Sequence, residues 1–193
     1  MNILICGVGG QGTVLASRLL AWIAMEKGLK ARTAETIGMA QRGGSVVSHV
    51  RTGHEIFSPL IPKGGADVIL ALEPAEAVRC LPYLKQGGAV VVNTAPIQPV
   101  TVSLAGKPYD PEAMLQALQR SGADVHPVNG PAVCAACGSQ KVLNTAMLTA
   151  AAKLGFLDVT VDELKAAITS YTKPKFHALN LKAIDCVAGE SLS

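Results

Sequence analysis

The sequence is short of charged and aromatic side chains. Of its 193 residues, 16% are charged and 4% aromatic, whereas 49% are hydrophobic. Charged residues make up about 25% of a typical soluble domain, and such a hydrophobic chain is not a disordered or solvated tail. The low charge leaves two alternatives. Either a partner subunit covers much of the surface, or helices rich in Ala and Gly pack closely on a sheet.

The sequence also lacks the features of proteins that bind nucleic acid, span a membrane or are exported. The net charge is +3 and the 17 Lys and Arg never occur in runs of more than two, so the basic patch of a nucleic-acid binder is missing. The apolar run Leu19–Met25 is far shorter than the roughly 20 residues that span a bilayer, and no signal segment precedes the first apolar run. Five scattered cysteines, an odd number, indicate reduced thiols rather than a disulfide framework. We therefore expect a cytoplasmic protein that binds neither nucleic acid nor membrane.

Apolar runs alternate with helical patterns, which predicts an α/β fold. The patterns place strands at 2–6, 30–35, 45–51, 67–72, 89–93, 100–104 and 125–128, and helices at 11–27, 74–84, 111–120, 140–154, 161–171 and 176–187.

Two local signals refine this pattern. Residues 52–54 resemble a turn that pairs the strand at 45–51 with residues 55–57, which predicts an antiparallel hairpin. Gly87 and Gly88 are expected to end the helix that starts at Pro74. We expect residues 1–193 to form a single domain: a three-layer, Rossmann-like, mostly parallel sheet with an antiparallel hairpin portion and a helical C-terminal third.

The glycines of GVGGQG follow the first strand and open the first helix. Gly7, Gly9 and Gly12 match the G-x-G-x-x-G spacing, in which glycines permit a tight turn and close approach to a helix N-terminus that attracts anions. Glu35 lies 23 residues after Gly12, near where a dinucleotide-binding fold places its ribose-binding acid. Three alternatives stay open: dinucleotide binding, docking of an anion or coenzyme phosphate, and a purely structural turn.

A second glycine cluster spans residues 38–45 and contains one guanidinium, that of Arg42. Such a loop is able to hold a phosphate or carboxylate bidentately, or to dock a partner or lead into a hairpin. Because both glycine loops adjoin strand ends, we expect them to converge at one edge of the sheet.

The remaining chemistry-bearing residues form no catalytic set. Cys134 and Cys137 have CxxC spacing, but without a second CxxC or a His pair they cannot complete a four-ligand metal site, so buried structural thiols are favoured. His49 lies in an alternating strand without a nucleophile or acid partner, which favours an ordinary strand histidine. The sequence thus predicts no catalytic residue and no metal site on this chain.

Five segments together resemble one family. They are GVGGQG, MAQRGGSVVSHVR, DVILALEP, AVVVNT and SQKVLNTAMLTAAAKLG. These segments are similar to the gamma-type subunit or domain of the 2-oxoacid:ferredoxin oxidoreductases, and within that family most closely to the beta subunits of indolepyruvate ferredoxin oxidoreductases. The resemblance covers essentially the whole chain.

The resemblance implies a subunit that is inactive alone. In this family the complex oxidatively decarboxylates a 2-oxoacid, here an aryl one such as indolepyruvate, to the acyl-CoA and CO₂ and passes electrons to ferredoxin. Thiamine diphosphate and [4Fe-4S] clusters are implied on an alpha-subunit partner, with CoA as co-substrate, in a hetero-oligomer. The alternatives are the gamma subunit of a pyruvate, 2-oxoglutarate or branched-chain 2-oxoacid enzyme, and a bracing subunit without coenzyme contact.

The resemblance also assigns site residues. The positions that match the coenzyme-facing or intersubunit edge are Gly9, Gly10, Gln11 and Gly12, with Gln41, Arg42, Gly43 and Gly44. A glycine-rich edge without a catalytic set is typical of one part of a larger enzyme. Of the two alternatives for the low charge, this favours a covered surface.

Overall fold

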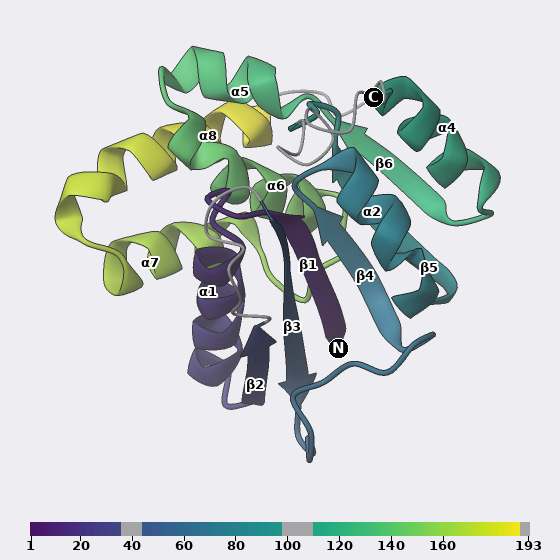
Figure 1. Cartoon of the computed structure of the whole chain (residues 1–193). Coiled ribbons are helices and arrows are strands. Elements are labelled where there is room, and N and C mark those ends of the chain that lie inside the picture. Colours follow the sequence, from purple (N-terminus) through teal and green to yellow (C-terminus); the bar gives the residue numbers. More distant parts are fainter. Residues whose placement is uncertain (36–43, 98–109, 190–193) are drawn as a thin grey trace.

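The computed structural model describes residues 1–35, 44–97 and 110–189, and within them a six-stranded sheet is sandwiched between helices (Figure 1). The strands are β1 (Asn2–Val8), β2 (Lys30–Glu35), β3 (Ser45–Gly53), β4 (Ala66–Ala71), β5 (Leu84–Asn93) and β6 (Asp124–Val128). The helices are α1 (Thr13–Glu26), α2 (Pro74–Cys80), α4 (Pro111–Arg120), α5 (Gly130–Cys137), α6 (Leu143–Lys153), α7 (Val161–Tyr171) and α8 (His177–Gly189), with short 3-10 turns η2 (Leu81–Tyr83), η3 (Gln140–Val142) and η4 (Pro174–Phe176). None of these helices has the length and apolar character needed to cross a membrane.

The strand order is β2-β3-β1-β4-β5-β6, with β3 antiparallel to both of its neighbours. Strands β1, β4, β5 and β6 run parallel to one another. The predicted α/β class, the mostly parallel sheet and the helical C-terminal third are confirmed. The strand candidate at 100–104 lies outside the described residues.

The antiparallel portion lies one element earlier than the sequence suggested. β3 pairs with β2 on one side and β1 on the other, and residues 54–65 form no strand. The predicted pairing of 45–51 with 55–57 is therefore wrong. The alternation of apolar and polar residues in SVVSHVR predicted the strand correctly. Periodicity does not indicate, however, which strands it pairs with.

The helix after β4 is shorter than expected. The α-helix ends at Cys80, because Pro82 has no N–H with which to continue the i to i−4 hydrogen bonds, and the 3-10 turn η2 follows up to Tyr83. Gly87 and Gly88 lie inside β5, where Gly87 has φ +71° and the pairing register with β4 shifts. These glycines mark an irregularity in a strand rather than the end of a helix.

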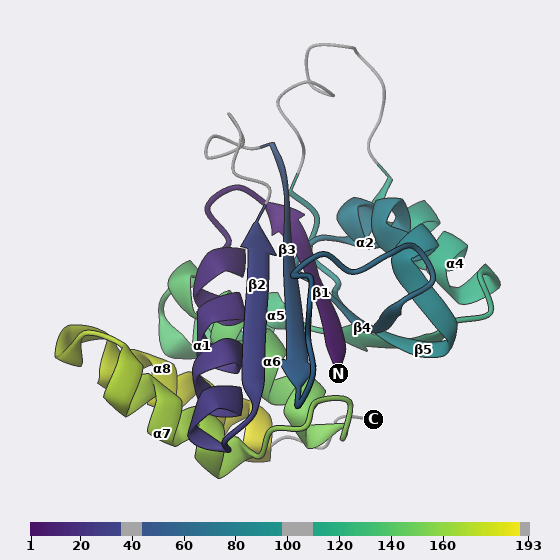
Figure 2. The ribbon, with the colours of Figure 1, turned by 90° about the horizontal axis from the view of Figure 1, so that it is seen from below.

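Alternate residues of the strands pack into two hydrophobic cores, one on each face of the sheet. Ile3 and Ile5 of β1 pack with α1, α5, α6, α7 and α8, whereas Leu4 and Cys6 pack with α2 and α4 on the opposite face. Figure 2 shows the two helical layers on either side of the sheet. Both faces are buried, which explains why the parallel strands are almost continuously apolar.

The first core includes a helix that the sequence pattern missed. α5 starts after Asn129, whose side chain accepts a hydrogen bond from the Ala132 N–H, and it contains the CxxC segment. α6 is buried along most of its length, from Leu143 to Ala151, because it lies between the sheet and α8.

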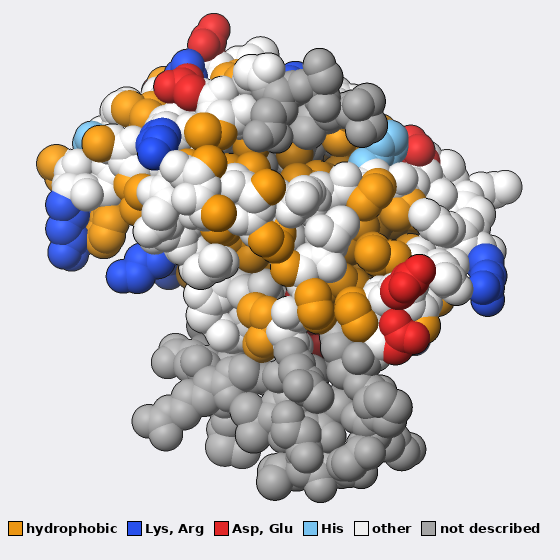
Figure 3. All heavy atoms as spheres, turned by 90° about the horizontal axis from the view of Figure 1, so that it is seen from above, with side chains coloured by type: hydrophobic (Ala, Val, Ile, Leu, Met, Phe, Trp, Pro, Cys, Tyr) orange, Lys and Arg blue, Asp and Glu red, His pale blue; other side chains and the backbone are white. Residues whose placement is uncertain are grey.

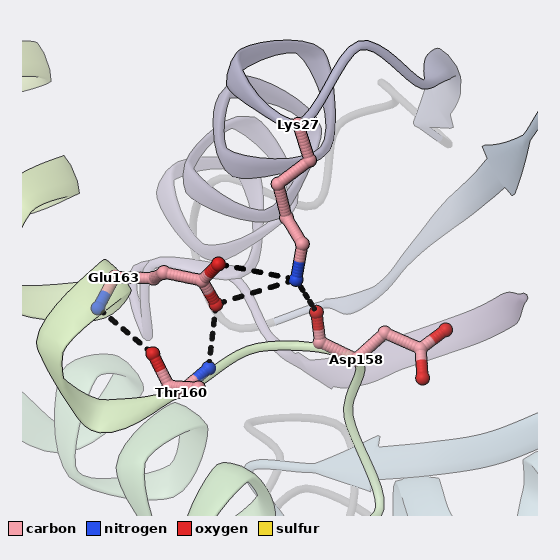
Figure 4. Close-up of polar contacts among 4 residues, drawn as sticks. All are labelled: Lys27, Asp158, Thr160 and Glu163. Carbon is pink, nitrogen blue, oxygen red and sulfur yellow. Dashed lines mark hydrogen bonds and ion pairs between the residues drawn. The ribbon is translucent and has the colours of Figure 1, made fainter.

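A polar tether joins α7 to the end of α1 (Figure 4). Thr160 and Glu163 form a capping box in which the Glu163 N–H donates to Thr160 Oγ1 at 3.2 Å, and the Thr160 N–H to Glu163 Oε2 at 2.7 Å. Lys27 Nζ lies 3.1 Å from Glu163 Oε1 and donates to the Asp158 carbonyl at 2.8 Å. These contacts hold α7, and through it the C-terminal helices, against α1.

Candidate functional site

The candidate site lies at the carboxyl ends of β1, β4 and β5. These strands are parallel, so the segments that follow them meet at one edge of the sheet, where α/β proteins bind ligands. Figure 3 looks onto this end, which presents apolar patches between a few charged side chains.

The glycine turn after β1 has the backbone geometry that only glycine adopts readily. Gly10 has φ +101° and is exposed, and Gly12 has φ +86° and immediately precedes α1. A Cβ on Gly12 would lie 2.7 Å from Asn144 Nδ2, whereas one on Gly10 would meet nothing within 4 Å. Gly12 is thus fixed by close packing, and Gly10 is open to an approaching group.

The start of α1 has no side-chain cap and no acidic residue in its first turn. Within the part of the chain that the structure describes, its first N–H groups therefore have no intrahelical or side-chain acceptor at the edge of the sheet, an arrangement that favours an anion.

The amide of Gln11 is held inside the fold. Its Oε1 accepts a hydrogen bond from the Val8 N–H at 2.6 Å, and its Nε2 donates to the Leu72 carbonyl at 2.8 Å. Gln11 thereby ties the end of β1 to the end of β4. The Gln11 side chain therefore holds the turn in place. It is the backbone of the turn, and not this side chain, that is available to a ligand or partner.

The two glycine loops meet where the described residues allow a comparison. The Gly9 N–H donates to the Gly44 carbonyl at 2.9 Å, which joins the turn after β1 to the residue before β3. The expected convergence is confirmed at this pair. Gln41, Arg42 and Gly43 lie outside the described residues.

Two buried carboxylates at the start of α2 were not singled out from the sequence. Glu73 caps α2 by accepting the Glu76 N–H at 3.0 Å, and the two residues are only 1% and 2% exposed. Ser45 Oγ donates to Glu76 Oε2 at 2.5 Å, and Arg79 Nη1 lies 2.5 Å from Glu76 Oε1. Glu76 therefore links β3 to α2 beside the glycine loops. The signal was present as Glu-Pro-x-Glu directly after a buried strand.

Asparagines complete the edge. Asn93 Nδ2 donates to the Leu72 carbonyl at 3.0 Å, so this carbonyl receives both Asn93 and Gln11. Asn144 Nδ2 donates to the Gly12 carbonyl at 3.3 Å, while its buried Oδ1 has no partner among the described residues. A buried acceptor without a partner is uncommon in a folded protein.

Four of the five cysteines are buried, and all five are free thiols. The hydrogen bond to Cys80, together with complete burial, raises the pKa of Cys6 well above its ordinary value, so this thiol stays neutral. Cys134 and Cys137 are buried and free, as predicted for structural thiols. Within the described part of the chain no three His, Cys, Asp or Glu side chains are grouped to hold a metal ion, so these thiols do not fit a four-thiolate iron-sulfur cluster.

Glu35 lies away from the glycine turn. β3 stands between β2 and β1, so the strand that carries Glu35 is two spacings, or about 10 Å, from the strand that carries the turn. Its Oε1 accepts a hydrogen bond from Ser17 Oγ of α1 at 3.0 Å. In a dinucleotide-binding fold the acidic strand lies next to the first strand, so this order weighs against the ribose-binding alternative.

His49 is an ordinary strand histidine, as predicted. It is 6% exposed, its Nδ1 accepts the Ile61 N–H at 3.1 Å, and its ring meets Tyr83 edge-on at 5.8 Å between centroids. Burial lowers its pKa.

Comparison with known proteins adds to this geometry. Residues 2–189 match the family described as "Pyruvate ferredoxin/flavodoxin oxidoreductase". The chain is 39% identical to "Indolepyruvate oxidoreductase subunit IorB" of Archaeoglobus fulgidus over 196 aligned positions, covering 100% of this chain and 96% of that protein.

Two solved structures share the fold. The gamma subunit of a keto/oxoacid ferredoxin oxidoreductase from Geobacter sulfurreducens superposes with a TM-score of 0.68 at 23% identity, covering 98% of this chain and 99% of that one. A 2-oxoglutarate:ferredoxin oxidoreductase from Magnetococcus marinus, with 2-oxoglutarate, coenzyme A and succinyl-CoA bound, matches with a TM-score of 0.70 at 20% identity. That match covers 100% of this chain and 32% of the larger one, so a chain of this size is similar to one part of a longer enzyme.

Proposed function

The chain belongs to the pyruvate ferredoxin/flavodoxin oxidoreductase family as a gamma-type subunit of the 2-oxoacid:ferredoxin oxidoreductases, and from this premise we propose that it serves in the oxidation of indolepyruvate. The complete reaction joins the acyl group of the 2-oxoacid to the sulfur of CoA. It releases CO₂ and transfers two electrons to ferredoxin. The 39% identity to a relative named for indolepyruvate supports this 2-oxoacid. The alternatives that remain are pyruvate, 2-oxoglutarate and branched-chain 2-oxoacids.

The observation that carries the proposal is the glycine edge. An exposed Gly10 and an uncapped α1 offer backbone N–H groups to an anion, and Gln11 holds this turn in place through Val8 and Leu72. Among the described residues, the carboxylates beside this edge are Glu73 and Glu76, and both are buried and hydrogen-bonded within the protein. Such a surface suits a part that holds a co-substrate or faces a catalytic partner.

We assign the edge to CoA or to the intersubunit contact. Gly9, Gly10 and Gly12 present their backbone there, Gly44 is bonded to Gly9, and Gln41, Arg42 and Gly43 supply the sequence of the second loop. Thiamine diphosphate and [4Fe-4S] clusters belong, in this proposal, to an alpha-subunit partner in a cytoplasmic hetero-oligomer that also receives ferredoxin. This chain alone binds none of these cofactors and does not turn over.

The variant Arg42→Ala separates the two roles of the edge. If the second loop contacts CoA, the assembled complex shows a raised KM for CoA while its assembly is unchanged. If the chain only braces its partner, the variant weakens assembly and leaves that KM unchanged. Steady-state kinetics and sedimentation of the same preparations measure both quantities. An Arg42→Ala complex with normal KM and normal assembly contradicts the assignment of this loop to the edge.

A further inference from the structure

A second feature of the molecule adjoins the glycine edge at the start of α1. A groove of about 410 Å³ runs between the first turn of α1, η3 and the corner that joins α7 to α8. Leu15 and Leu179 contribute to its apolar floor, and Tyr171 and Phe176 line it while staying 42% and 37% exposed. Two of the seven aromatic residues of the chain therefore line one groove and stay partly exposed.

Lysines surround this apolar floor. Lys141, Lys173 and Lys175 line the groove, all three are exposed, and none of the described lining residues is acidic. Lys175 Nζ lies 5.0 Å from the centre of the Phe176 ring, a cation–π distance. In the space-filling view, basic and apolar side chains lie side by side at the left margin, where α7 and α8 run (Figure 3). The groove therefore combines an apolar centre with a positively charged rim.

The polar groups beneath the lysines are already used inside the protein. Asn180 Oδ1 accepts a hydrogen bond from Thr145 Oγ1 at 2.6 Å, and its Nδ2 donates to the Phe176 carbonyl at 2.8 Å. Thr172 Oγ1 donates to the Ile168 carbonyl at 2.6 Å. Small-molecule sites of this volume have a few converging polar groups that orient the ligand. Here the side chains of Asn180 and Thr172 are bonded within the protein instead. An apolar centre with a charged rim is typical of a protein–protein interface.

We infer that this groove, which we name the α7–α8 groove, docks an acidic segment of the partner subunit that inserts an apolar side chain between Tyr171 and Phe176. The charge of the rim selects the acidic segment, and the aromatic pair supplies the anchor contact that dominates interface energies. The inference rests on the proposed role of the chain as a subunit of a larger enzyme. It adds a contact surface beside the glycine edge.

The test uses the purified partner subunit and the charge-reversed variant Lys173→Glu/Lys175→Glu. Both lysines are exposed, so the isolated variant is expected to fold, which its melting temperature checks. We expect its affinity for the partner to fall at least about tenfold at low salt, and the salt dependence of assembly to flatten, because the attraction becomes repulsion.

Phe176→Ala is expected to weaken assembly without changing the salt dependence. The matched control Lys30→Glu/Met25→Ala alters an exposed lysine and an exposed apolar residue elsewhere and should assemble like the wild type.

Zero-length carbodiimide cross-linking of the wild-type complex tests the chemistry of the contact directly. It joins lysines to carboxylates in contact, so the inference expects Lys141, Lys173 or Lys175 joined to Asp or Glu of the partner. Unchanged affinity of both groove variants overturns it. A raised KM for CoA with intact assembly also overturns it, since the groove would then hold a small molecule. If the wild-type chain does not bind the partner at all, the proposed function itself fails and the occupant of the groove with it.

Discussion

At the scale of single residues, Gly12 is constrained both by its backbone conformation and by the packing around it. Its φ of +86° disfavours any side chain, and a Cβ there would also push into Asn144. Gly12→Ala is expected to lower the free energy of unfolding by about 2–3 kcal/mol, from the left-handed backbone and a disturbed hydrogen bond. Gly28 is a matched control, because its φ is +73° but nothing lies within 4 Å of a Cβ.

Gly28→Ala should therefore cost only the backbone part, about 1 kcal/mol. Urea denaturation of both variants measures the difference. Equal losses would show that Asn144 does not constrain the turn.

His49 predicts a pH dependence of stability. Burial holds its pKa below the ordinary value, so the unfolded chain binds a proton at a higher pH than the folded one. The stability that the neutral ring contributes is complete above about pH 6.5 and is lost as the pH falls toward the lower folded-state pKa. Protonation would also remove the acceptor that Ile61 uses.

His49→Asn keeps an acceptor but does not titrate. We expect the wild type to lose more stability than this variant between neutral pH and pH of about 5.5. Thermal unfolding of both proteins across that range measures the difference. Parallel pH profiles would contradict this role of His49.

The glycine turn and its convergence with the second loop follow from residue patterns, because glycine at fixed offsets has a backbone reason. The structural role of Gln11 does not follow, since its partner Leu72 is 61 positions away. The same holds for Asn144, which reaches Gly12 from α6 across 132 positions. Such contacts depend on how elements pack, and no local pattern reports them.

At the scale of elements, the tether between α1 and α7 links two ends of the chain. The hydrogen bond from the Thr160 backbone, with Lys27 beside it, holds the pKa of Glu163 below its ordinary value. Its contribution is therefore present above about pH 4.3 and is lost as the pH falls through the lower folded-state pKa.

Glu163→Gln removes the charge and should cost about 0.5–1 kcal/mol at neutral pH and less in acid, because the pair is partly exposed. Chemical denaturation at neutral and acidic pH is the measurement. Asp185→Asn breaks the more exposed pair of Lys165 and Asp185 and is expected to change little. A Glu163→Gln loss no greater than that of Asp185→Asn would show that the tether is not stabilising.

Elements with strong periodicity, such as β1, β4 and α7, were predictable from the sequence. α5 was not, because its eight residues are small and almost uniformly apolar, so neither period stands out. The neighbours of β3 were not predictable either. Strand pairing is a long-range choice, and here β3 inserts between β1 and β2.

At the scale of the whole molecule, the low fraction of charged residues fits a surface that partner subunits cover. We expect partners to cover the glycine edge and the α7–α8 groove, so that little of this surface faces water in the assembled enzyme. We expect the assembled enzyme to bury well over about 1,000 Å² of total surface at the contacts of this chain, as obligate assemblies do. Hydrogen exchange of the chain alone and in the complex should show protection at both surfaces. Protection at neither would favour the other alternative for the low charge, tight packing of small residues.

We propose that this chain works only as part of a larger enzyme. The most direct measurement is CoA-dependent reduction of ferredoxin by indolepyruvate, with the chain alone and with its thiamine-bearing partner at equal concentrations. We predict no turnover by the chain alone and turnover that rises with added chain until the partner is saturated. Turnover of indolepyruvate by the isolated chain, or full activity of the partner without it, would contradict the claim.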